Sequence, residues 1–263
     1  MALTRDSFSD LAVRVATGAA IAVVGLLAVW LGGWWFTGLV VAVAASLIWE
    51  LVRMIGGGPK RALWLGALAA ATIVSTKILP PGLALPLLMA VPVAGVGMLP
   101  RNRSIYGVMA SVIMLASFGL LFHRDEFGLT WMLWLVLLVA VTDIFGYFAG
   151  RIIGGPKFWP AVSPKKTWSG TIAGWIGAAL VGAAFMAATG SGVELIGISV
   201  ALSMAGQMGD IAESAVKRKM GVKDSSNLLP GHGGVFDRFD ALLGAALVLL
   251  LVESVTAFPP APL

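Results

Sequence analysis

The sequence predicts an all-α, polytopic integral membrane protein with about nine transmembrane helices, because of its composition, its long apolar segments and the placement of its basic residues. Of its 263 residues, 59% are hydrophobic and only 12% are charged, whereas soluble domains carry about 25% charged residues. The mean hydropathy is +0.93. A soluble domain of this length could not bury so much apolar surface.

A helix that crosses a bilayer core about 30 Å thick needs roughly 20 mostly apolar residues. We expect the spans at about 15–33, 34–54, 62–79, 81–99, 105–122, 129–149, 169–189, 194–216 and 241–258. Gly32-Gly33 and Pro80-Pro81 predict turns between the two closest pairs of segments. No small-residue cleavage site follows the first segment, which therefore predicts a retained helix rather than a signal peptide.

The basic residues predict the orientation of these spans. With the N-terminus in the cytoplasm and the C-terminus outside, all of the 18 Lys and Arg residues except Lys77 and Arg124 fall on the cytoplasmic side. Such a bias is typical of membrane proteins. It also explains the isoelectric point near 9.8 without a nucleic acid partner, which we do not expect.

The chain contains no cysteine and only two histidines, which excludes a disulfide framework and a cysteine nucleophile and disfavours a histidine-rich zinc site. Polar residues are concentrated in the second half. We therefore expect an anchoring region of about five helices at 1–128 and a catalytic region at 129–263, with cytoplasmic loops at 150–168 and 217–240.

Asp143, Asp210 and Glu213 are acidic residues inside predicted spans, where an ionisable group is costly and indicates function. Asp143 precedes Arg151 by eight residues and Asp210 precedes Lys217 by seven, which places both roughly 10 Å below the cytoplasmic edge. Two carboxylates at one depth could hold one metal ion. Glu253, near the outer end of its span, is expected to be solvated at the interface.

The polar residues of the eighth segment share one helical face, because Asp210, Glu213, Ser214 and Lys217 follow the i, i+3, i+4, i+7 spacing. One interpretation is a metal site. The alternative is a pairing of Asp210 or Glu213 with Lys217 that only neutralises charge.

The loop that follows combines groups suited to phosphates and a hard cation. Its carboxylates can ligate Mg²⁺, which prefers oxygen ligands, and Lys217, Arg218, Lys223 and Arg238 can neutralise phosphate oxygens. Its glycines allow backbone amides to approach an anion closely.

A second cytoplasmic segment, 154–170, carries Lys165 and Lys166. Ser163 followed by Pro164 predicts a helix N-terminus there, which would favour an anion. A basic patch that only binds anionic lipid headgroups is the alternative.

Residues 214–240 resemble the signature of the CDP-diacylglycerol synthases, or phosphatidate cytidylyltransferases. The pattern is Ser-x-apolar-Lys-Arg, four residues, Lys-Asp, then Pro-x-His-Gly-Gly-apolar-x-Asp-Arg-apolar-Asp. It is matched by Ser214, Lys217, Arg218, Lys223, Asp224, Pro230, His232, Gly233, Gly234, Asp237, Arg238 and Asp240. Asp143 and the run Ser163–Thr167 resemble two further marks of the family. Ser169 departs from it, because the family commonly has Glu there.

The resemblance implies that the protein transfers the cytidylyl group of CTP to phosphatidic acid, giving CDP-diacylglycerol and pyrophosphate, with Mg²⁺ held at a two-metal site. It implies metal binding by Asp210, Asp237 and Asp143. It implies catalytic roles for Asp210, Asp237, Lys217, Arg218 and Arg238. Phosphate or substrate binding is expected of Ser163, Lys165, Lys166, Thr167, Ser214, Lys223, His232, Gly233 and Gly234. His232 could instead only hold the loop, and Asp224 and Asp240 could pair with its basic residues.

The expected partners are CTP, phosphatidic acid and membrane lipids, with a homodimer as one candidate assembly, in a bacterial inner membrane with the active site facing the cytoplasm. A CTP-dependent lipid-alcohol kinase is an alternative that would transfer the γ-phosphoryl group instead. A cation- or proton-coupled transporter is an alternative of another class. It predicts acids near the midplane and polar residues in many spans, whereas Asp143 and Asp210 are expected close to one face of the membrane.

Overall fold

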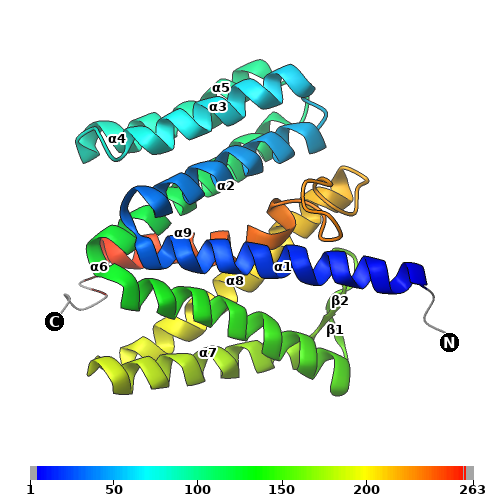
Figure 1. Ribbon diagram of the computed structural model, residues 1–263, viewed down its shortest axis with the longest axis vertical. Helices are drawn as coiled ribbons and strands as arrows, with labels where there is room; N and C mark the ends of the chain where they lie inside the picture. The colour runs from blue at the N-terminus through cyan, green and yellow to red at the C-terminus, as the bar shows by residue number, and fades with distance from the viewer. Residues whose placement is uncertain (1–4, 257, 259–263) are drawn as a thin grey trace. The chain divides into compact units, whose positions relative to one another are not determined.

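The protein is mostly helical in a computed structural model that describes residues 5–256 and 258 (Figure 1). The two chain ends, which the sequence predicts on opposite sides of the membrane, lie outside these residues. Within the described part, four helices are long and apolar enough to cross a membrane, at Gly33–Met54, Arg103–Ile152, Trp168–Thr189 and Glu194–Lys219. The helical membrane class is thus supported, and the number and direction of the crossings stay predictions.

The chain forms two compact units, each described by itself. The first comprises residues 1–114 and 220–238, and the second comprises residues 115–219 and 239–263. Helices α6 (Arg103–Ile152) and α9 (Phe236–Val255) begin in the first unit and continue in the second. The predicted boundary between an anchoring and a catalytic region at residues 128 and 129 stays a prediction.

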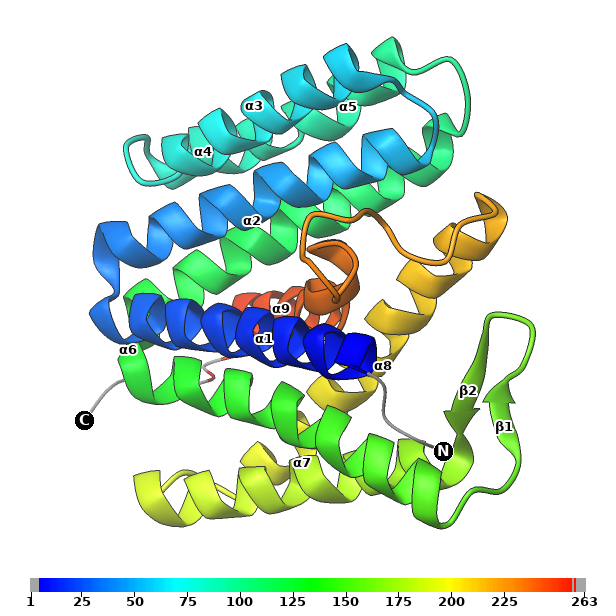
Figure 2. The same ribbon diagram turned by 45° about the vertical axis from the view of Figure 1, so that its right-hand side comes forward.

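Five helices lie entirely in the first unit: α1 (Arg5–Leu31), α2 (Gly33–Met54), α3 (Pro59–Ser75), α4 (Pro81–Leu88) and α5 (Ala90–Met98). Helix α2 packs against α1 and α3, and α3 also contacts α4 and α5 (Figures 1 and 2). The fully buried side chains Leu47 and Leu51 of α2 and Ile73 of α3 belong to the core of this unit. Their burial holds α2 in place.

Two breaks in the helices have local causes. The predicted span 81–99 is divided at Met89 into α4 and α5, with Pro86 inside α4 and Pro92 inside α5; each proline lacks the N–H that a continuous helix would use. Helix α6 contains 50 residues but is interrupted at Gly128, which has φ 84° and ψ −168°. This break separates the predicted spans 105–122 and 129–149.

The second unit contains a β-hairpin followed by two helices. Strands β1 (Lys157–Trp159) and β2 (Ser163–Thr167) are antiparallel, with Lys157 opposite Thr167. Helix α7 (Trp168–Thr189) follows the hairpin directly and packs against α8 (Glu194–Lys219) (Figure 2).

The prediction of a helix N-terminus at Ser163-Pro164 is wrong, because both residues belong to strand β2. The N-cap of α7 is Thr167, which has an extended backbone. Its side-chain Oγ1 accepts a hydrogen bond of 3.2 Å from Gly170 N. Ser169, in the first turn, donates from its Oγ to Gly154 O over 2.5 Å. At the position where the resemblance leads us to expect Glu, a serine hydroxyl thus fixes the preceding loop.

Candidate functional site

Three carboxylates come together in the second unit, where α8 lies against α9. Ligand oxygens of Asp210, Glu213 and Asp240 all lie within 4.8 Å of one another. The approach is close because two glycines face the opposite backbone: a Cβ at Gly209 would lie 2.4 Å from Asp240 O, and one at Gly244 would lie 2.3 Å from Ala205 O. The helix spacing predicts Asp210 beside Glu213, and the crossing adds Asp240.

Lysines partly neutralise this cluster. Lys166 Nζ, from strand β2, lies 2.6 Å from Asp210 Oδ2 and also donates to Gln207 O over 3.2 Å. Lys217 Nζ lies 2.5 Å from Oε2 of Glu213, whose side chain is fully buried. The alternative pairing of Lys217 is therefore observed for Glu213. Asp210 instead pairs with a lysine that the sequence associates with phosphate binding.

Asp240 precedes the predicted span 241–258, and its carboxyl is strongly perturbed by its surroundings. Burial, reinforced by the nearby charges of Asp210 and Asp143, raises the pKa of Asp240 to about 8, although the Ala241 amide and Lys217 oppose the rise. The ionised form of a carboxyl in such a place requires a compensating positive charge. The cluster, with oxygen ligands only, therefore fits a hard divalent cation.

Two other predicted residues of the second unit lie close to this cluster. Ser214 Oγ donates to Asp210 Oδ1 over 3.3 Å. Asp143 acts on Asp240 electrostatically but is not among the three residues that share ligand distances. Its predicted role as a ligand stays a prediction.

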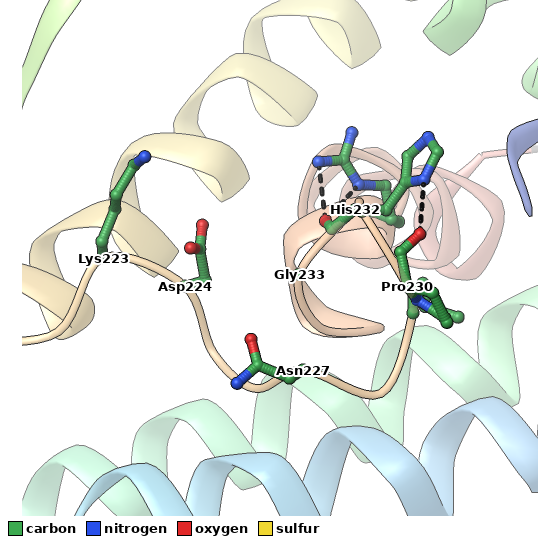
Figure 3. A pocket seen from close by; sticks show the side chains of 9 residues that line it. Lys223, Asp224, Asn227, Pro230, His232 and Gly233 are labelled. Atoms are coloured by element: carbon green, nitrogen blue, oxygen red, sulfur yellow. Dashed lines mark hydrogen bonds between the residues drawn. The ribbon is translucent and has the colours of Figure 1, made fainter. Parts of the chain in front are cut away.

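The first unit holds residues 220–236, which we call the signature loop and which lead into α9. A polar pocket is lined by Lys223, Asp224, Asn227, Leu229, Pro230, Gly231, His232, Gly233 and Arg238. The side chains of Lys223, Asp224 and His232 extend from the loop to the same side (Figure 3). The pocket thus combines two cationic groups with one carboxylate, a set that suits a phosphate or a phosphate-bound cation.

Backbone contacts fold the loop tightly around this pocket. Leu229 N donates to Gly233 O, and His232 N donates to Leu229 O, each over 2.9 Å. Arg238 donates from Nε and Nη2 to His232 O over 3.2 and 2.9 Å (Figure 3). His232 therefore serves the loop through its carbonyl, and its ring lies in the pocket lining.

Asp237 closes the loop at its other end. Its Oδ2 accepts hydrogen bonds from Ser225 N, Ser225 Oγ and Gly234 N, over 2.9, 2.9 and 2.8 Å. A carboxylate oxygen with three donors is firmly oriented. The predicted role of Asp237 as a metal ligand stays a prediction, and its observed role is to join Ser225 to Gly234.

The remaining predicted residues are distributed over both units. Gly233 and Gly234 lie in the loop of the first unit, and Lys165 is exposed on strand β2 of the second. Arg218 lies in the last turn of α8, next to the buried Lys217. Their roles toward phosphates stay predictions.

Sequence reasoning missed Glu50, which is fully buried in α2 and contacts the signature loop. The available signal was an acid in an otherwise apolar helix. Its spacing to Arg53 also fits an ordinary ion pair within one helix, which made the residue inconspicuous. The Arg53 guanidinium instead lies over the Trp49 ring, 5.8 Å from its centroid.

The expectation that Glu253 is solvated is wrong. Its side chain is only 1% exposed, and its Oε1 contacts Nδ1 of the equally buried His123. Trp134, His123 and Phe127 form aromatic contacts around this pair. A buried carboxylate is stable when paired, and the partner comes from a helix that is remote in the sequence.

Known proteins are similar to this chain over most of its length. A family model described as the cytidylyltransferase family matches residues 12–255. A phosphatidate cytidylyltransferase of Brucella suis is 35% identical over 266 residues, covering 97% of each chain. One of Bacillus subtilis is 30% identical over 256 residues, covering 89% of this chain and 94% of the relative. One of Staphylococcus aureus is 37% identical over 167 residues, covering 59% and 64%.

Proposed function

Because the chain belongs to the cytidylyltransferase family, we propose that it is a phosphatidate cytidylyltransferase, which makes CDP-diacylglycerol and pyrophosphate from CTP and phosphatidic acid. The observation that carries this proposal is the match to named phosphatidate cytidylyltransferases along nearly the whole chain. The acidic cluster and the pocket of the signature loop support it chemically.

The reaction joins two polyanions. A phosphate oxygen of phosphatidic acid forms a bond to the α-phosphorus of CTP, and the bond from that phosphorus to the bridging oxygen of the β-phosphate breaks. Pyrophosphate leaves with the electron pair. The nucleophile is already ionised at neutral pH, so positioning and charge stabilisation carry the catalysis. Lys223 and Arg238 at the pocket, with Lys217 and Arg218 on α8, are the groups that would hold phosphates.

Asp210, Glu213 and Asp240 are the residues that would hold Mg²⁺ in the second unit, because their oxygens are already grouped at ligand spacing. When bound, the ion supplies positive charge that orients phosphate oxygens and stabilises the leaving pyrophosphate. Lys166 pairs with Asp210 at this cluster. The predicted ligands Asp237 and Asp143 and a second ion remain part of the proposal.

The membrane arrangement is also proposed: about nine spans, the N-terminus in the cytoplasm, the C-terminus outside, and the site on the cytoplasmic face of a bacterial inner membrane. The bias of Lys and Arg toward one side of the predicted spans supports this orientation. The acyl chains of phosphatidic acid would then stay in the bilayer while its headgroup reaches the site from the lipid surface.

The activity is tested with purified protein in detergent, phosphatidic acid, Mg²⁺ and CTP labelled at its α-phosphorus. Label that enters the lipid phase, with release of pyrophosphate, is the expected result. CTP labelled at its γ-phosphorus is the matched control and should leave the lipid unlabelled. Label from the γ-position in an added lipid alcohol would point to the kinase, and no turnover with either substrate would contradict the proposal.

A further inference from the structure

The buried carboxylate of Glu50 is an acceptor at the centre of the signature loop. Its Oε1 accepts from Ser226 Oγ over 2.6 Å and from Val235 N over 2.8 Å. Its Oε2 accepts from Phe236 N over 2.7 Å and from Ser225 Oγ over 3.1 Å. The glutamate side chain is fully buried, so these four contacts replace the water that it lacks.

The pattern of donors explains why a carboxylate occupies this position. Each oxygen of Glu50 accepts from one serine hydroxyl and one backbone N–H, so only a group with two equivalent acceptor oxygens satisfies both sides. Val235 and Phe236 lie at the start of α9, where the first amides of a helix have no partner within it. Glu50 supplies that partner from α2, and its negative charge is favourable at a helix N-terminus.

The same contacts reach Asp237. Ser225 Oγ lies between two carboxylates, 3.1 Å from Glu50 Oε2 and 2.9 Å from Asp237 Oδ2. Its single proton can satisfy one of them at a time, and Ser225 N donates to Asp237 as well. The position of the Asp237 carboxylate is therefore tied to α2 through one serine.

Packing around Gly234 leaves the loop little freedom. A Cβ at Gly234 would lie 2.0 Å from Ser225 Oγ and 2.6 Å from Glu50 Oε1. The second glycine of the Gly-Gly pair is thus needed for the loop to reach Glu50. Gly234 is therefore required for the packing of the loop, in addition to its predicted role of letting a phosphate approach the backbone.

We propose that Glu50 is a positioning residue of the cytidylyltransferase reaction: it fixes the conformation of residues 225–236 and thereby places Asp237 and the pocket lining for the phosphates of CTP. This inference rests on the proposed function. It assigns part of the active site to α2, in the half of the chain where the sequence indicates only membrane anchoring.

Glu50→Gln is the direct test, because it preserves the size of the side chain. In either orientation its NH₂ group faces a backbone N–H, which cannot accept a hydrogen bond. We expect amide hydrogen exchange in residues 222–238 to become at least roughly tenfold faster, since the loss of a hydrogen bond to a charged group costs about that factor or more. The KM for CTP should rise by about the same factor, with a smaller change in the KM for phosphatidic acid.

Thr37→Val is the matched control. Thr37 is buried on the same helix, and its hydroxyl donates to Gly33 O, away from the loop. Both the exchange of residues 222–238 and the KM for CTP should stay at the values of the unsubstituted protein. If Glu50→Gln does not yield monodisperse protein, Ser226→Ala removes one of the four donors and should give a smaller change in the same two measurements.

The outcomes separate this inference from the proposed function. Hydrogen exchange needs no substrate, so a protein without lipid labelling would refute the function while the exchange result still tests the loop contacts. Unchanged exchange in both Glu50→Gln and Ser226→Ala would overturn the inference. Faster exchange with an unchanged KM for CTP would also overturn it, because Glu50 would then be structural only.

Discussion

The buried and half-buried carboxylates discussed above differ in their partners. Asp210 pairs with Lys166, and Glu213 pairs with Lys217. Glu50 is surrounded by neutral donors. Asp240 instead lies next to other acids, and burial raises its pKa. A cation bound at the acidic cluster around Asp240 would therefore stabilise the ionised form of this carboxyl.

Asp210→Asn should abolish most of the lipid labelling from CTP, with a loss of about 10²–10³ in kcat, the usual cost of removing one electrostatic stabiliser from an active site. Mg²⁺ should raise the thermal unfolding temperature of the unsubstituted protein and have less effect on the variant. Glu194→Gln, at the exposed start of the same helix, is the control and should retain both properties. Full labelling by Asp210→Asn would remove this residue from the site.

Gly234→Ala should strongly reduce activity, because the added methyl group would overlap Ser225 Oγ and Glu50 Oε1. We expect a loss of about 1–3 kcal/mol in the free energy of unfolding, as for other overpacked positions, together with a raised KM for CTP. Gly38→Ala, where nothing lies within 4 Å of the new Cβ, is the matched substitution on α2. Equal behaviour of the two variants would contradict the packing described for the loop.

At the scale of elements, the helices were the most predictable part of the structure. The predicted spans 34–54 and 169–189 differ from α2 and α7 by one residue at their starts, because bilayer thickness sets how long an apolar helix must be. The hairpin was not predicted. Its strands contain three and five residues with lysines and a proline, and so carry no alternating apolar pattern.

The candidate site was predictable where it depends on local spacing. Asp210 and Glu213 lie on one helical face, as the spacing of the residues indicates. The presence of Asp240 in the same cluster requires α8 and α9 to touch at Gly209 and Gly244, and a single sequence contains no signal for that contact. Glu50 did offer a signal, an acid in an otherwise apolar helix, but nothing in the sequence connects it to the signature loop that it contacts.

The pair formed by His123 of α6 and Glu253 of α9 fastens the C-terminal end of α9. Glu253→Leu or His123→Leu should each lower the free energy of unfolding by about 1.5–3 kcal/mol, the range for a hydrogen bond to a charged group, as measured by thermal unfolding in detergent. The double variant should lose less than the sum of the single losses, because the interaction is shared. If the losses of the two single variants simply add in the double variant, the contact contributes nothing to stability. Lipid labelling below the unfolding temperature should be retained in all three variants.

For the whole molecule, the absence of cysteine makes the predicted topology directly measurable. Val193, between α7 and α8, is 72% exposed and is predicted outside, whereas Lys157 of the hairpin is exposed and predicted in the cytoplasm. In intact cells, a membrane-impermeant thiol reagent should label Val193→Cys but not Lys157→Cys. Permeabilised cells should give labelling of both. The reverse pattern in intact cells would invert the proposed orientation.

The contact between Glu50 and Ser225 joins residues 175 positions apart, which has a consequence for biosynthesis. At synthesis rates of about 5–20 residues per second, α2 leaves the ribosome on the order of ten seconds or more before its donors exist. Until those donors exist, water is the partner available to the Glu50 carboxyl, so we expect the end of α2 that carries it to stay at the aqueous boundary. Completion of the signature loop then displaces that water. The donors that surround the Glu50 side chain are thus supplied by residues translated long after α2.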